Sequence, residues 1–178
     1  QHQLEYHATR MLEDDRARDA VIHFHKQWLG ATDLSKVLPA RSVYGPLYYD
    51  LSAEPEFSAS DGTPEDFEWP SVLIPLRASM NIETELFIER TIFDGGGTFT
   101  ALMSDNHGYL SEITRPLYGE ATRQLSDSSI SVAAPSGERI ELYPAEFPAD
   151  QRAGVLTLPS TLALLSHPVH PAPVLRGA

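Results

Sequence analysis

The clearest helical pattern in the sequence is PLRASMNIETELFIERTIFDGGG, residues 75–97. Between its proline and its three glycines, apolar side chains recur every three or four residues on two adjoining faces. They are Leu76, Met80 and Phe87 on one face and Ile82, Leu86 and Phe93 on the other. This spacing predicts an α-helix over residues 76–93, and a helix that is apolar over so wide an arc is typically buried. We expect it to be the central helix.

The next clearest periodic pattern lies near the N-terminus, after a short helix expected over residues 4–12. Asp14 or Asp15 can cap a helix that runs to Trp28, and Gly30 provides its stop. The apolar side chains of this segment fall on one face: Ala17, Ala20, Val21, Phe24 and Trp28. We therefore expect Trp28 to lie in the core.

The remaining segments predict short elements and long connections. Helices are expected over residues 98–103, 105–118 and 155–165, and alternating residues around 135–137 favour a small β-hairpin within 129–143. Residues 31–75 are rich in proline and aromatic residues, which indicates a loop packed on the domain. The expected fold class is mainly α: one irregular domain over residues 1–178, with five to seven helices, long loops and at most one hairpin.

Composition excludes several functions. The 13 basic and 25 acidic residues give a net charge of −12, which would repel nucleic acid and anionic membranes. No apolar run reaches the roughly 20 residues that a membrane-spanning helix needs. The chain has no cysteine, so it can form no disulfide, thiolate metal site or covalent haem attachment of its own.

Three segments resemble parts of one protein family. The first is FHKQWLG at residues 24–30, and the second is MNIETE at 80–85, followed by Tyr109-Leu110 and PLYG at 116–119. The third runs from RAGVLT at 152–157 through His167-Pro168 to PVLRG at 173–177. Together they resemble an uncharacterised helical domain family of large secreted bacterial proteins, in which the domain accompanies c-type cytochrome modules. Ala172 and Ser111 depart from the residues that this family more often carries.

The resemblance implies a structural or docking domain of an extracytoplasmic, multi-domain redox protein with an electron-transfer role. Its partners would be neighbouring haem-bearing domains of the same polypeptide, with haem c in adjoining segments and no cofactor in this one. In the family, the arginine-glycine pair leads into a further helix and then a Cys-x-x-Cys-His segment. We therefore expect residues 1–178 to be a segment of a longer exported protein that continues past Ala178.

Five residues are candidates for binding or structural roles: His25, Glu83, Arg152, His167 and Arg176. Glu83 shares a face with Leu76, Met80 and Phe87, so it needs a partner when buried. Arg90, Arg152 and Arg176 are the candidate partners. In that case Glu83→Ala would leave a charge uncompensated, at a cost of ~3–5 kcal/mol.

The histidines leave alternatives open. His25 lies at the edge of the Phe24 and Trp28 face, where it is either a hydrogen-bonded core residue or an axial ligand or proton carrier for a neighbouring module. His167 and His170 could contribute two ligands to a metal, but two ligands do not make a site, so no metal is expected.

A second function from a different class uses the same residues. The chain could be a catalytic or ligand-binding module, for example for carbohydrate, in which the aromatic loop of residues 44–69 covers Glu83, His25 and nearby arginines. No second carboxylate or nucleophile is placed near Glu83 by sequence spacing, so the sequence specifies no reaction.

Overall fold

The computed structural model describes residues 2–34, 37 and 73–166. Its helices are α1 (His2–Leu12), α2 (Asp15–Trp28), α4 (Leu73–Glu89), α5 (Phe99–Ser104), α6 (Arg115–Tyr118) and α7 (Pro159–Leu164). A π-helical turn, η5 (Arg90–Asp94), continues α4, and a 3₁₀ turn, η6 (Val155–Thr157), precedes α7. The strands are β1 (His107–Leu110), β2 (Arg123–Gln124), β3 (Ile130–Ala133) and β4 (Arg139–Glu146).

The expected fold class is wrong, because the strands form a four-stranded antiparallel sheet and the domain is mixed α/β. β4 is the central strand. Its second half pairs with β1 and β2 on opposite edges, and its first half pairs with β3 as the expected hairpin. The hairpin prediction is confirmed, but β4 continues past it to Glu146 and recruits two further strands.

The helix expected over residues 105–118 is also wrong, since that segment forms β1, a turn and the short α6. Gly108 explains the close packing of this strand: a Cβ atom at this position would lie 2.5 Å from Cε2 of Phe147. A glycine inside a strand often marks such an approach. Pairing with β4 and packing against Phe147 therefore override the local helical pattern.

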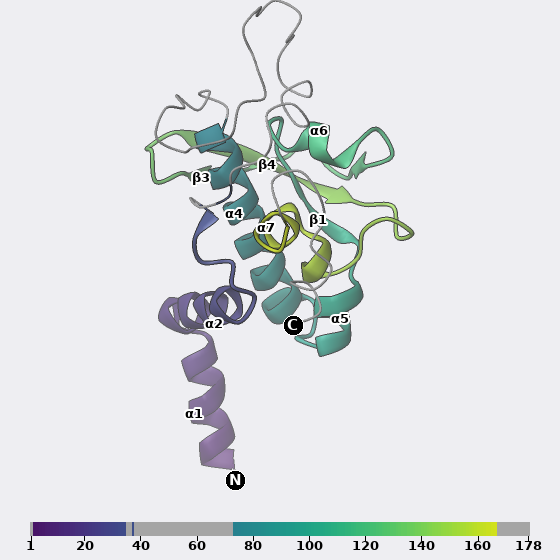
Figure 1. Cartoon of the computed structure of the whole chain (residues 1–178). Coiled ribbons are helices and arrows are strands. Elements are labelled where there is room, and N and C mark those ends of the chain that lie inside the picture. The colour runs from purple at the N-terminus through teal and green to yellow at the C-terminus, as the bar shows by residue number, and fades with distance from the viewer. Residues whose placement is uncertain (1, 35–36, 38–72, 167–178) are drawn as a thin grey trace, which may run out of the picture.

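The central helix is confirmed. In Figure 1, α4 runs through the middle of the domain, with the sheet on one side and α7 on the other. On the sheet side, Ile82 packs with Tyr109 and Leu142. On the helical side, a second cluster joins α4 to α5 and to η6: Phe87, Ile88, Leu102, Val155 and Leu158, with Leu29 and Ala31. Contact on both sides explains the wide apolar arc of this helix.

Buried hydroxyl groups tie α4 to its neighbours. Ser79 Oγ lies 2.5 Å from Ser111 Oγ, at the end of β1, and Thr84 Oγ1 shares a hydrogen bond with Ser160 Oγ of α7. Thr84 Oγ1 also donates to the Met80 carbonyl. Each of these buried polar groups is satisfied, as stable interiors require.

Several helices begin or end at the capping and stop residues that the sequence predicts. Asp14 caps α2 by accepting a hydrogen bond from the Arg16 backbone N–H at 3.0 Å, and Thr98 caps α5 in the same way through Ala101. Gly30 follows α2 with a φ of +68°. None of the helices in the described ranges has the length and apolar content needed to cross a membrane.

The prediction that Trp28 lies in the core is wrong. Its side chain is 52% exposed, and that of Phe24 is 61% exposed. Helix α2 contacts α4 through a different face, on which Ile22 joins the core cluster and Lys26 Nζ lies 2.5 Å from Glu85 Oε1. This contact face leaves Phe24 and Trp28 pointing outward, while Ala17 and Val21 at the edge of the apolar stripe are half-buried.

The exposure of Trp28 predicts a small stability effect. Trp28→Ala should change the free energy of unfolding by no more than about 0.5 kcal/mol, because few buried contacts are lost. The adjacent Leu29, which is 9% exposed and belongs to the core, is the matched control. Leu29→Ala should cost about 2–5 kcal/mol in the same urea titration. Equal losses for the two variants would show that Trp28 is buried in solution.

Candidate functional site

Glu83 is the most unusual side chain in the interior. It lies in the middle of α4, is 0% exposed, and has no hydrogen-bond partner for either carboxyl oxygen in the described part of the chain. Burial raises its pKa to about 8, and the Tyr118 hydroxyl and the positive charge of Arg152 offset only part of this effect. Glu83 is therefore largely protonated at neutral pH.

Tyr118 faces Glu83 from the end of α6. Its ring stacks on that of Phe147, with centroids 4.3 Å apart and planes 13° from parallel. The hydroxyl interacts with the Glu83 carboxyl group. The two groups do not have the geometry of a direct hydrogen bond, so the buried hydroxyl also lacks a hydrogen-bond partner among the described residues. Burial and the neighbouring carboxyl group raise the pKa of Tyr118 well above its ordinary value.

Arg152 completes the group, which we call the buried carboxyl site: Glu83, Tyr118 and Arg152. The Arg152 guanidinium lies 4.7 Å from the Tyr118 ring centroid. Its Nη1 donates to the Thr157 carbonyl at 2.9 Å, and its Nη2 donates to the Leu117 carbonyl at 3.0 Å. Backbone carbonyls therefore hold the guanidinium in place.

The expected ion pair of Glu83 with Arg90 or Arg152 is wrong, because neither arginine forms a salt bridge with it. Arg152 acts on Glu83 only through its charge. Arg90 acts instead on Asp105 and Tyr109. The third candidate, Arg176, lies outside the described residues. In the described ranges, Glu83 is thus a buried neutral acid and not half of an ion pair.

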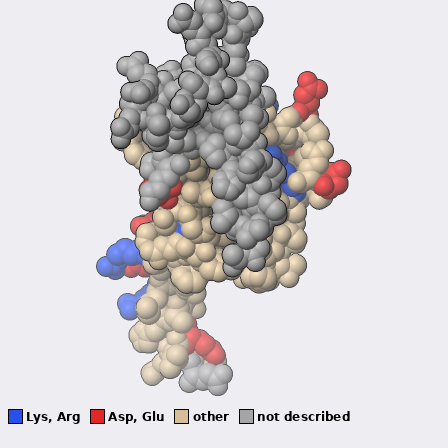
Figure 2. Space-filling view, in the orientation of Figure 1, with Lys and Arg blue, Asp and Glu red and all other residues tan. Residues whose placement is uncertain are grey.

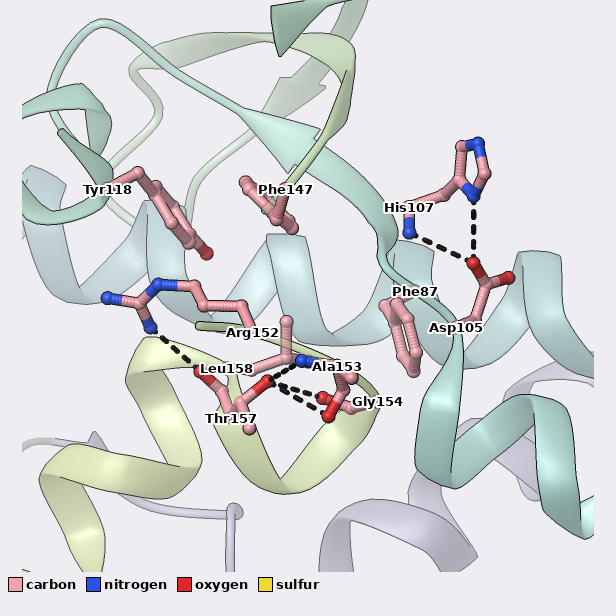
Figure 3. Close-up of a pocket in the computed structure, with 10 residues that line it drawn as sticks. All are labelled: Phe87, Asp105, His107, Tyr118, Phe147, Arg152, Ala153, Gly154, Thr157 and Leu158. Atoms are coloured by element: carbon pink, nitrogen blue, oxygen red, sulfur yellow. Dashed lines mark hydrogen bonds and ion pairs between the residues drawn. The ribbon is translucent and has the colours of Figure 1, made fainter. Parts of the chain in front are cut away.

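A small pocket adjoins the buried carboxyl site (Figure 3). Tyr118 and Arg152 line one end, and Asp105 and His107 line the other. Phe87, one helical turn after Glu83 on α4, lies between them. About 10 Å³ is open to the centre of a water molecule, which is close to the minimum for holding one water.

Asp105 and His107 form a tight pair at this second end. Asp105 Oδ1 accepts hydrogen bonds from both the backbone N–H and the ring Nδ1 of His107, each at 2.9 Å. Burial alone would raise the pKa of Asp105, but these hydrogen bonds and the charges of His107 and Arg90 outweigh it and lower that pKa. The pair thus favours an ionised aspartate.

Of the other candidates from the sequence, the structure describes His25, which does not join this site. His25 donates from Nδ1 to the Val21 carbonyl at 2.8 Å, and its ring contacts Phe24 and Trp28 on α2. His167 and His170 lie outside the described residues, as does the aromatic loop of residues 44–69. Within the described ranges, no three metal-binding side chains gather in one place.

Sequence reasoning missed Tyr118, Asp105 and His107. The Asp-x-His spacing was the available signal for the pair, since an aspartate often accepts a hydrogen bond from the backbone N–H two residues later. No local pattern marked Tyr118, because α4 and α6 meet only in the fold. Chemically, the arrangement can hold a proton on Glu83 and a water-sized molecule beside Tyr118 and Arg152, whereas pockets for drug-sized ligands are typically about 300 Å³ or larger.

The fold and the site together describe a mixed α/β domain built around one central helix, with a neutral carboxyl group buried near a water-sized pocket. A model of the PSD4 family, described as "Protein of unknown function (DUF1592)", matches residues 1–119, and the chain belongs to that family. The matched region includes Glu83 and Tyr118 and ends before Arg152. No curated protein and no solved structure matches the chain.

Proposed function

We propose that this chain is a docking domain of an extracytoplasmic, multi-domain redox protein, and that it holds a neighbouring haem-bearing module in place. One observation supports the docking role above all others: an exposed aromatic surface at the junction of α2 and α5. The redox assignment has a separate basis, which is the resemblance of residues 24–30, 80–85 and 152–177 to a family that accompanies c-type cytochrome modules.

The aromatic patch consists of Phe24, His25, Trp28 and Phe99. Phe24 and Trp28 lie one helical turn apart on α2, and the Trp28 ring centroid is 6.5 Å from that of Phe99 on α5. Phe99 is 66% exposed. Aromatic residues are enriched in the cores of protein interfaces, and contiguous exposed apolar surface commonly marks such an interface. The aromatic patch therefore has the composition of a binding surface.

The surroundings of the aromatic patch fit an uncharged partner surface. In Figure 2, charged side chains gather towards one end of α2, whereas the visible surface from α2 towards α5 carries almost none. Helix α1 has no buried residue, and it exposes Leu4, Met11 and Leu12. An isolated helix of this length is only marginally stable in water. A partner that covers the exposed apolar side chains of α1 would therefore stabilise this helix.

The alternative is a catalytic or carbohydrate-binding module that uses Glu83, His25 and nearby arginines. It is less well supported, because His25 hydrogen-bonds within α2 and the pocket beside Glu83 holds about one water molecule. A ligand-binding assay with the chain at high concentration separates the two functions. Saturable binding of a sugar that Glu83→Gln abolishes would favour the alternative.

The docking role predicts that the longer polypeptide loses an interdomain contact when the aromatic patch is removed. Trp28→Ala with Phe99→Ala should expose interdomain linkers to limited proteolysis, because buried aromatic anchors contribute about 2 kcal/mol or more each. Leu125→Ala is the control, since Leu125 is exposed outside the aromatic patch. If the double variant is cleaved at the control rate, the aromatic patch does not dock a neighbour.

The redox context has its own test. The longer polypeptide, purified from the compartment to which it is exported, should show a c-type haem absorption band, while residues 1–178 alone should be colourless. Haem attachment requires a Cys-x-x-Cys-His segment, which we expect beyond Ala178. A longer polypeptide without this band would remove the redox assignment and leave the docking role standing.

A further inference from the structure

We propose that the buried carboxyl site binds one ordered water molecule, which bridges the Glu83 carboxyl group and the Tyr118 hydroxyl. This inference is independent of the docking role. It starts from three buried polar atoms that face a common region without a protein partner in the described ranges: both carboxyl oxygens of Glu83 and the Tyr118 hydroxyl oxygen. More than nine-tenths of each side chain is buried.

The energetic argument is that such groups rarely stay unpaired. A buried donor or acceptor left without a hydrogen bond destabilises the folded state, and this site has three such atoms. Internal waters typically make about three hydrogen bonds to groups of this kind. One water molecule between Glu83 and Tyr118 would satisfy both side chains, which interact but do not hydrogen-bond directly.

The site also has the right size and shape. The pocket lined by Tyr118 and Arg152 has room for the centre of about one water molecule, and Tyr118, which interacts with the Glu83 carboxyl group, belongs to both the pocket and the buried carboxyl site. Phe147 and Phe87 close its sides (Figure 3). A larger polar ligand would have to displace these rings or Tyr118.

The donors and acceptors of the site match those of water. A protonated Glu83 carboxyl group donates one hydrogen bond to the water and can accept one from it. The Tyr118 hydroxyl can donate or accept, so the water retains capacity for one further bond toward the pocket. Arg152 contributes positive charge, but both of its terminal nitrogens already donate to backbone carbonyls.

The water also gives the buried acid a route for proton exchange. Glu83 can release its proton to the water and regain one from it, with a net transfer of one proton between the carboxyl group and solvent. Asp105 and His107 line the far end of the same pocket, where exposure is greater.

A high-resolution crystal structure of the chain, grown below pH 8, tests this proposal. It should show one water at about 2.7–3.0 Å from a Glu83 carboxyl oxygen and from Tyr118 Oη. In solution, a long-lived water should give nuclear Overhauser contacts to the backbone amides of Ala153 and Gly154, which line the pocket. A direct Glu83–Tyr118 hydrogen bond with no water, or an arginine paired to Glu83, would overturn it.

A pair of tyrosine variants provides the control. Tyr118→Phe should remove the water signal and shift the infrared C=O stretch of protonated Glu83, because a bridging partner is lost. Tyr109→Phe, at a second buried tyrosine on β1, should leave both signals unchanged. If the water and the stretch persist unaltered in Tyr118→Phe, the bridge does not exist. Glu83→Gln identifies the stretch by eliminating it.

Discussion

Gly154→Ala should destabilise the domain by about 3 kcal/mol or more, because the backbone of α5 occupies the space that the new methyl group needs. A Cβ atom on Gly154 would lie 2.1 Å from the Met103 carbonyl oxygen. Gly154 also has a φ of +68°, and its N–H donates to the Asp105 carbonyl at 2.7 Å. The substitution should therefore separate the segment before η6 from α5.

Gly137→Ala is the matched control for this effect. Gly137 has a φ of +85° in the turn between β3 and β4, but nothing lies within 4 Å of an added Cβ atom. Its substitution should cost only about 1 kcal/mol, from backbone strain alone. Urea denaturation of both variants separates the clash from the strain. Similar losses at the two positions would mean that Gly154 is not packed against Met103.

The free energy of unfolding of the domain should fall as pH rises from about 5 to about 8. Glu83→Gln should remove the contribution of residue 83 to this fall. Glu83 has a pKa of about 8 in the folded protein and an ordinary value near 4.5 when unfolded. Between these values the unfolded chain releases the proton that the folded chain keeps, so rising pH favours unfolding. The pKa difference corresponds to at most roughly 5 kcal/mol.

The measurement is urea denaturation of both proteins across this pH range. Gln at position 83 cannot ionise, so the difference in unfolding free energy between wild type and variant should change steadily with pH and level off above pH 8. Other shifted groups, such as Asp105, have lowered pKa values and act at lower pH. Parallel pH curves for the two proteins would show that Glu83 is ionised throughout and has a charged partner.

For Arg90 and Arg152, the structure removes the basis of the expectation for Glu83→Ala that the sequence suggested. That expectation assumed an arginine left uncompensated, whereas Arg152 keeps its two backbone hydrogen bonds when Glu83 is removed. The loss in Glu83→Ala should instead come from the cavity that the missing side chain leaves. Burial of Glu83 itself was predictable, because it shares a helical face with Met80 and Phe87.

Local signals placed most of the helices and the β3–β4 hairpin, but not strands β1 and β2. Residues 76–93 are apolar over a wide helical arc between Pro75 and Gly95, and the Asp14 and Thr98 caps act within four residues of sequence, so these features were readable. Strands β1 and β2 depend on pairing with β4, about 20 to 40 residues away in the chain. Short strands with few alternating residues carry little signal of such pairing.

The orientation of α2 shows a different limit of sequence reasoning. Its apolar stripe identified an amphipathic helix correctly, but the stripe does not say whether it faces the domain's own core or a partner. Ile22 and the Lys26–Glu85 ion pair set the docking of α2 on α4, and the stripe that includes Trp28 points outward. The buried carboxyl site was equally unreadable, since three separate segments supply its residues.

The docking role depends on whether a neighbour covers the aromatic patch. Hydroxyl-radical footprinting with mass spectrometry measures this directly, by comparing oxidation of Trp28 and Phe99 in residues 1–178 alone and in the longer polypeptide that the proposal requires. Both side chains should oxidise readily in the isolated chain, in keeping with their exposure of 52% and 66%, and both should be protected in the longer polypeptide. Equal oxidation of Trp28 and Phe99 in the two proteins would contradict the docking role.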